Sequence, residues 1–279
     1  MDEQLSVAQR LSTCSLPPNA GSTTALLRLL MDSDKDMADV ASAIQSHAVI
    51  VGKLISLANS AWSNPVRPVT ALDEACSRLG LDVVRTLSIA LAVGRSFIVS
   101  RCPEFDPRQY WISSIVAADI ASRLALSLKL DPSTARAAGL LHNIGLLWLA
   151  DCAPEETDAA LKAARTLSDF GVDEHLQQKC GIGYRDAGAV LMSRWTLPDA
   201  LISSFKLNQR IDGQSEARQM YELIQTSADL TANVLTGNTE PFDDCCLDEL
   251  TATRLNSEIA HQVSRLPKTE VLAARLVGS

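Results

Sequence analysis

The side chains best suited to chemistry in this sequence include its thiols. Seven cysteines occur along the 279 residues, and two of them, Cys245 and Cys246, are adjacent. Neighbouring thiolates can bind a soft metal ion, but no further Cys or His stands at ligand spacing from this pair, and no C-x-x-C motif occurs. We therefore interpret the cysteines as thiols of a reduced, cytosolic protein.

Arginines form a second set of candidates, because guanidinium groups pair with phosphates and stack on bases. A receptor for a cyclic dinucleotide would need such residues near a cleft. The candidates are Arg67, Arg78, Arg85 and Arg185. Their spacing singles out none of them, so a receptor for a cyclic dinucleotide or another small ligand stays an alternative hypothesis.

Composition and charge narrow the class of protein. Hydrophobic residues make up 47% of the chain and charged residues 21%, which is typical of a globular protein and argues against disorder. Asp and Glu total 33 against 25 for Lys and Arg, so the net charge is −8. Proteins held to nucleic acid by phosphate neutralisation are normally basic, and we expect no nucleic-acid partner.

The elements that must position these residues are predicted to be helices throughout. Apolar residues recur at helical spacing from end to end, whereas runs of alternating strand-forming residues are missing. Asp106-Pro107 and Asp131-Pro132 each predict a helix start, because Asp caps the first amides and Pro needs no partner for a missing N–H. Gly80 is predicted to end a helix. The fold class is therefore all-α.

No targeting or membrane-spanning segment is expected. The N-terminal residues lack a signal-peptide apolar run. The most apolar stretch, 139–150, is interrupted by His142 and Asn143 and is shorter than the roughly 20 residues that a membrane helix needs. We predict a cytoplasmic protein with no membrane partner.

Four stretches together resemble one family. They are LPPNAGSTTALLRLL at 16–30, IVGKLISLANSAWSNPVRPVTALDEACSRLGLDVVRTLSIAL at 50–91, AAGLLHNIGLLWLA at 137–150 and YRDAGAVLMSRWTLPDALISSF at 184–205. The combination is similar to HDOD proteins, the HD-related output domains of bacterial signalling. The resemblance implies two helical subdomains, the second like an HD-type phosphohydrolase bundle.

The predicted organisation follows from this resemblance and from the break around Cys102-Pro103. We expect an N-terminal tail at 1–15 and an HDOD domain at 16–236, divided into an N-terminal helical subdomain at 16–104 and an HD-like subdomain at 105–236. Residues 237–279 would form a C-terminal helical extension, which could cover the core or mediate self-association as a homodimer.

HD phosphohydrolases use a His, an adjacent His-Asp pair and a distal Asp to hold divalent metals that activate water. The resemblance places a vestigial version of that pocket at Ser113, His142, Asn143, Tyr184, Asn208 and Asp229. Asn143 replaces the carboxylate of the pair, and only His142 and Asp229 remain as plausible ligands. Two ligands are too few for a useful metal site, so we expect no cofactor, no metal and no catalysis.

For His142 the favoured interpretation is a buried histidine bonded to a neighbouring carbonyl or to Asp229. Tyr184 and Arg185 would open a helix beside the pocket. Possible contacts to a partner or ligand are Trp62, Arg67 and Arg185.

Three functions are weighed. The favoured one is a non-catalytic signalling module that binds a regulatory protein or small ligand through the groove between the subdomains, in cyclic-di-GMP signalling. Its partner would be a cyclase, a phosphodiesterase or a response regulator supplied in trans, with a nucleotide as a possible ligand. The alternatives are a metal-dependent phosphohydrolase or phosphodiesterase with a rearranged site, and the cyclic-dinucleotide receptor described above.

Overall fold

The computed structural model of the protein describes residues 20–60, 67–166, 171–205, 215–236 and 249–277. Every regular element in these ranges is an α-helix, which confirms the predicted all-α class. The helices are α2 Ala20–Met31, α3 Met37–Ile44, α4 Ala48–Ala58, α5 Leu72–Leu79, α6 Leu81–Gly94, α7 Pro107–Leu128, α8 Pro132–Leu141, α9 Ile144–Cys152, α10 Pro154–Thr166, α11 Val172–Cys180, α12 Tyr184–Arg194, α13 Asp199–Ser203, α14 Glu216–Thr236 and α15 Glu249–Val277.

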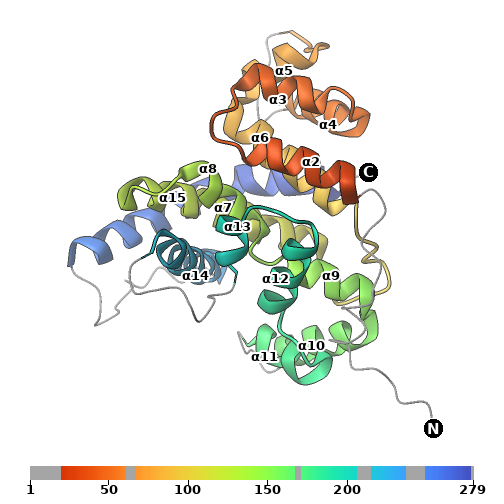
Figure 1. The fold of residues 1–279 in the computed structure, drawn as a ribbon, viewed down its shortest axis with the longest axis vertical. Helices are drawn as coiled ribbons and strands as arrows, with labels where there is room; N and C mark the ends of the chain where they lie inside the picture. The colour runs from red at the N-terminus through yellow and green to blue at the C-terminus, as the bar shows by residue number, and fades with distance from the viewer. Residues whose placement is uncertain (1–19, 61–66, 167–170, 206–214, 237–248, 278–279) are drawn as a thin grey trace.

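The helices gather into two groups (Figure 1). Helices α2 to α6 lie together at the top of the view, and α7 to α14 lie below them. Helix α15 packs along α7 and also contacts α14, α6 and α4, so it reaches both groups. Near its end, Arg275 Nη1 donates to Ser56 Oγ in α4 at 3.1 Å. Helix α15 therefore packs against helices of both groups.

The two predicted Asp-Pro starts are confirmed. Asp106 Oδ1 accepts from the backbone N–H groups of Arg108 at 2.8 Å and Gln109 at 3.1 Å, and Pro107 is the first residue of α7. Asp131 caps α8 in the same way, with its carboxylate accepting from Thr134 N–H at 2.7 Å. Both caps satisfy amides that have no partner within their helix.

Gly80 separates α5 from α6 with a φ of +83°, a conformation that side chains with a Cβ rarely adopt. The chain therefore turns sharply here, and α6 begins at the next residue. This turn places Asp82, at the start of α6, beside Arg136 of α8.

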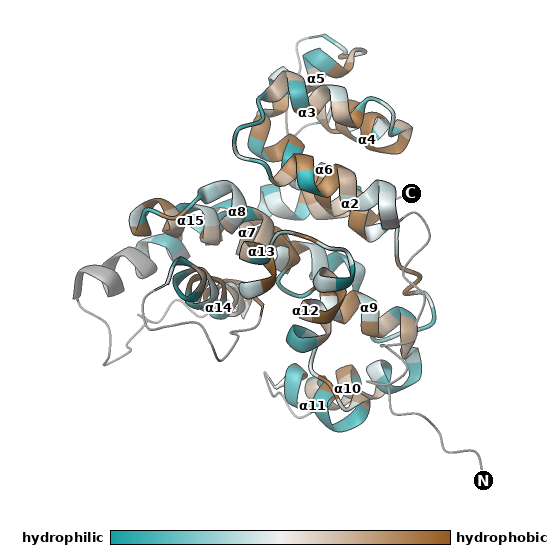
Figure 2. Ribbon diagram, in the orientation of Figure 1, coloured by the Kyte–Doolittle hydropathy of each residue, from teal (hydrophilic) through white to brown (hydrophobic). Residues whose placement is uncertain are grey.

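Hydrophobic residues, brown in Figure 2, concentrate where helices face one another, while the outer turns of α10 and α11 are largely hydrophilic. Helix α7 lies at the centre of this core. By length and composition it is the one helix in the described ranges that could cross a membrane, but most of its apolar length is buried against other helices. That burial is typical of a core helix.

Candidate functional site

A hollow of about 670 Å³ lies between α7, the α8–α9 junction, α10 to α12 and α14. The predicted residues that line it are Ser113, His142, Asn143, Tyr184, Arg185 and Asp229. The fold thus brings together side chains from four separate stretches of sequence. We call this hollow the HD-like pocket.

The remaining predicted residues are elsewhere. Trp62 and Asn208 lie outside the described residues. Arg67 is exposed and pairs with Glu74 of α5 at 3.7 Å, so it does not line the HD-like pocket.

His142 follows the last turn of α8 and is buried. Its Nδ1 lies 2.7 Å from the carbonyl oxygen of Gly139. Because a carbonyl only accepts, Nδ1 must carry the proton, which leaves a lone pair on Nε2. Burial lowers the pKa of His142 to about 4, against the donation to Gly139, so the ring is neutral at neutral pH. Of the two bonds considered for His142 from sequence, the one to a neighbouring carbonyl is formed.

Asn143 is also buried, and its side chain points into the helix packing. Its Oδ1 accepts a hydrogen bond from Ser114 Oγ at 3.0 Å. The sequence assigned Ser113 to this part of the site, and Ser113 does line the hollow, but its neighbour makes the contact. Successive helical residues differ in direction by about 100°, so adjacent serines face different surroundings. In the sequence, the only indication of the Ser114 contact was that Ser113 and Ser114 are adjacent.

Close backbone packing of α9 on α12 positions the wall of the HD-like pocket that the start of α12 forms. A Cβ on Gly145 would lie 1.9 Å from the carbonyl oxygen of Tyr184 and 2.5 Å from the nitrogen of Gly188. Only a residue without a side chain allows this approach. It holds Tyr184 and Arg185, the first residues of α12, at the HD-like pocket.

Tyr184 and Arg185 form a local pair. Arg185 Nε donates to Tyr184 Oη at 3.4 Å, and the guanidinium carbon lies 5.8 Å from the ring centroid of Tyr184. A guanidinium over an aromatic face is held by attraction to the ring electrons. Among the described residues that line this hollow, Arg185 is the only Arg or Lys.

Carboxylates dominate the charge of the HD-like pocket. Glu104, Asp106, Asp173 and Asp229 line it. Burial raises the pKa of Asp229, and the charge of Arg185 opposes that rise. Oδ1 of Asp173 is buried and has no hydrogen-bond partner among the described residues. Sequence reasoning assigned Asp106 only its role as a helix cap, and it did not identify Glu104 or Asp173, which are ordinary acidic residues in the sequence.

The arginines considered for phosphate binding do not converge. Arg67 and Arg78 both contact Glu74. Arg85 is buried and donates to the carbonyl of Asp32 at 2.7 Å and to Ser133 Oγ at 3.1 Å, so it ties the loop after α2 to α8. Only Arg185 reaches the HD-like pocket.

The donor set for a metal is sparse. Within the described ranges, no three His, Cys, Asp or Glu side chains lie close enough together to hold a metal ion. At Asn143 the HD-like pocket presents an amide where the His-Asp pair of an HD phosphohydrolase has a carboxylate.

The described residues thus form an all-helical fold whose HD-like pocket lies at a buried His-Asn pair. The family model described as the HDOD domain matches residues 16–211, and the chain belongs to this family. HDOD domains are associated with signalling and are generally non-catalytic.

Three known proteins show how far the likeness extends. A crystal structure from Marinobacter aquaeolei VT8, named as a candidate signal transduction protein, has a TM-score of 0.76 and 22% identity and covers 98% of this chain and 62% of that one. A candidate phosphohydrolase from Shewanella amazonensis SB2B has a TM-score of 0.66 and 21% identity, covering 97% and 98%. These likenesses establish the fold.

A curated protein from Treponema pallidum (strain Nichols), named as uncharacterized, is 23% identical over 257 residues. The match covers 91% of this chain but 48% of that protein. The chain thus spans about half the length of this relative and about three fifths of the Marinobacter structure.

Proposed function

We propose that the protein is a non-catalytic signalling module that binds a basic segment of a partner protein at the HD-like pocket. The partner would be a cyclase, a phosphodiesterase or a response regulator of cyclic-di-GMP signalling. The observation that carries this proposal is the hydrogen bond of Asn143. Its side-chain oxygen accepts from Ser114 between packed helices. A carboxylate at the same place would be needed to bridge metals.

The charge of the pocket supports a cationic occupant. Four carboxylates line it against one guanidinium, and His142 is neutral. Such a surface attracts Lys and Arg side chains and repels phosphoesters, with an effect that weakens as salt rises. Glu104 is offset by an ion pair with Arg165, whereas Asp173 and Asp229 interact electrostatically with Arg185.

The apolar part of the lining supports a peptide rather than a small ion. Phe105, Tyr110, Leu146 and Leu161 contribute hydrophobic surface around the carboxylates. A Lys or Arg side chain combines an aliphatic stem with a charged head, and it can use both kinds of surface.

The first test is affinity capture of the tagged protein from its host, with mass spectrometry of proteins and nucleotides and with metal analysis of the same eluate. A captured signalling protein is then purified, and its affinity is measured for the wild type, for Asp229→Asn and for the exposed control Asp199→Asn. We expect Asp229→Asn to weaken binding by about tenfold, the effect of one lost charged contact, and added salt to weaken it further.

Two outcomes would contradict the proposal. Stoichiometric metal together with phosphoester hydrolysis that His142→Ala abolishes would establish the phosphohydrolase alternative. A nucleotide bound at the pocket without a protein partner would establish the receptor alternative.

A further inference from the structure

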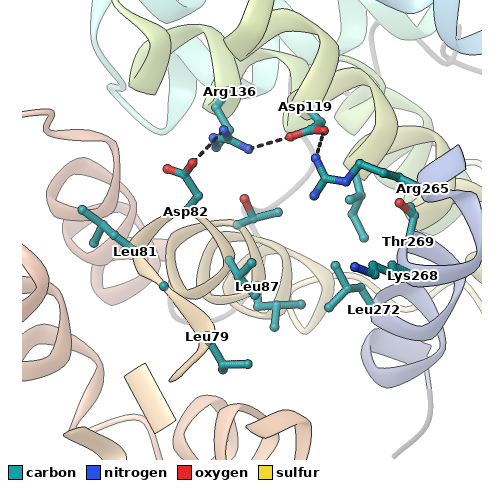
Figure 3. A pocket seen from close by; sticks show the side chains of 14 residues that line it. Leu79, Leu81, Asp82, Leu87, Asp119, Arg136, Arg265, Lys268, Thr269 and Leu272 are labelled. Carbon is teal, nitrogen blue, oxygen red and sulfur yellow. Dashed lines mark hydrogen bonds and ion pairs between the residues drawn. The ribbon is translucent and has the colours of Figure 1, made fainter. Parts of the chain in front are cut away.

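A second hollow, of about 540 Å³, lies where the two groups of helices meet α15 (Figure 3). We call it the junction pocket. Its walls come from the α5–α6 turn and α6, from α7 and α8, and from α15. The lining residues are Leu79, Gly80, Leu81, Asp82, Val83, Thr86, Leu87, Ile115, Asp119, Arg136, Arg265, Lys268, Thr269 and Leu272.

Helix α15 supplies one complete wall. Arg265, Lys268, Thr269 and Leu272 follow the i, i+3, i+4, i+7 spacing, which places them on one face of the helix. This wall lies beyond residue 211, where the family match ends. The junction pocket therefore depends on a segment that the family match does not include.

The polar side of the junction pocket is a network of charges. Arg136 contacts Asp82 at 3.0 Å and Asp119 at 3.4 Å, and Arg265 contacts the other oxygen of Asp119 at 2.5 Å. These carboxylates are thus already paired. Lys268 forms no ion pair with any residue in the described ranges, and its side chain extends toward the hollow in Figure 3.

The residues that line the junction pocket include three cationic side chains and two carboxylates, so the pocket carries an unmatched positive charge. Arg265 uses Nη1 for Asp119, and a guanidinium has further N–H donors for another anion. The opposite side is apolar, with Leu87, Ile115 and Leu272. The lining thus combines one region for a negative head with one for a hydrocarbon body.

We propose that the junction pocket binds a small organic anion with an apolar body, either a carboxylate or a phosphate monoester. The charged head contacts Lys268 and Arg265, and the body lies against Leu87, Ile115 and Leu272. This inference is independent of the function proposed for the HD-like pocket. Because the ligand touches both α6 and α15, its binding stabilises the docking of α15.

The test is calorimetric titration of the full chain with octanoate, octyl phosphate and octylamine, which share a hydrocarbon tail and differ in the head. We expect at least one of the two anions to bind at one site, and octylamine not to bind. Lys268→Glu should weaken that binding by about tenfold or more, the effect of a lost charge-assisted contact. Val83→Trp, which fills the hollow, should abolish it.

Two controls locate the binding. Lys179→Glu makes the same charge change at an exposed position of α11, and Ala232→Trp fills the HD-like pocket instead. Both should leave the affinity for the anion unchanged. The choice between octanoate and octyl phosphate identifies the head group.

The proposal is overturned if neither anion binds, if octylamine binds as tightly, or if Lys268→Glu and Lys179→Glu behave alike. It is also overturned if Ala232→Trp, rather than Lys268→Glu, removes the binding. Lys268 is exposed, so its substitution tests the site even if Val83→Trp does not fold.

Discussion

The HD-like pocket and the junction pocket differ in charge and in the way they are built. The HD-like pocket lies among α7 to α14, where Gly145 allows two helix backbones to touch, and it is lined by four carboxylates. The junction pocket joins three distant parts of the chain through paired charges around Asp119 and has one unmatched cation. The two proposals therefore assign opposite ligands to the two pockets, a cationic segment to the one fixed by close packing and an anion to the one fixed by docking of α15.

Gly145→Ala should break the HD-like pocket and have the largest effect. The added Cβ would meet the Tyr184 carbonyl oxygen at 1.9 Å, and backbone cannot yield without separating α9 from α12. We expect a loss of about 4 kcal/mol or more in the free energy of unfolding, or failure to fold. Chemical denaturation of the variant and the wild type measures this loss of free energy.

The matched control for this change is Gly52→Ala in α4, where a Cβ would meet nothing within 4 Å. Alanine has the higher helix propensity, so this variant should be more stable by up to about 1 kcal/mol. Equal effects of the two substitutions would contradict the close contact of α9 and α12.

His142 should make stability depend on pH from within the HD-like pocket. Its pKa falls from 6.5 to about 4 on folding because burial disfavours the charged ring. The neutral ring thus contributes stability above pH 6.5, and this contribution is lost as the pH falls toward 4. The total is about 3 kcal/mol, since each pKa unit corresponds to about 1.4 kcal/mol.

The measurement compares denaturation of the wild type and His142→Asn at several pH values. The asparagine amide can replace the donor to Gly139 but does not titrate in this range. The difference between the two proteins should change between pH 6.5 and 4, and other titrating groups cancel in that difference. A difference that is constant with pH would show that His142 is not buried in its neutral form.

Asp119→Asn should break the junction pocket and leave the HD-like pocket intact. Asp119 accepts from Arg136, Arg265 and Gln262, so its neutralisation weakens three contacts that join α7, α8 and α15. We expect a loss of about 2 kcal/mol, because the carboxylate is mostly buried and charged contacts contribute more than neutral ones.

Hydrogen exchange shows which helices of Asp119→Asn lose stability. Protection should fall in α15 and stay unchanged in α9 and α12. The control Glu222→Gln removes one partner of an exposed pair with Arg218 on α14 and should change little. Uniform loss of protection over the whole chain would contradict a separately docked α15.

Arg67→Ala should have the smallest effect, since this residue belongs to neither pocket. Its side chain is 80% exposed and contacts Glu74 at 3.7 Å. Exposed ion pairs contribute little, so the free energy of unfolding should stay within about 0.5 kcal/mol of the wild type. Binding at both pockets, measured by calorimetry, should also be unchanged. A clear loss of partner binding would return Arg67 to the set of contact residues.

Short stretches of sequence were enough to predict the local elements. Asp106 and Asp131 correctly predicted the starts of their helices, because an N-cap depends on residues only two or three positions away. The His142-Asn143 pair was placed in the site by the family resemblance. The family resemblance, which uses such short motifs, also identified most of the residues that line the HD-like pocket.

The contacts between side chains from distant parts of the chain depend on how the helices pack in the folded protein. The choice of Ser114 rather than Ser113 as the partner of Asn143 depends on the rotation of α7 against α9. The acidic character contributed by Asp173 and the cationic wall around Lys268 depend on which distant helices face these residues across each pocket. Such contacts are set by the packing of the whole core, and no local pattern in the sequence encodes them.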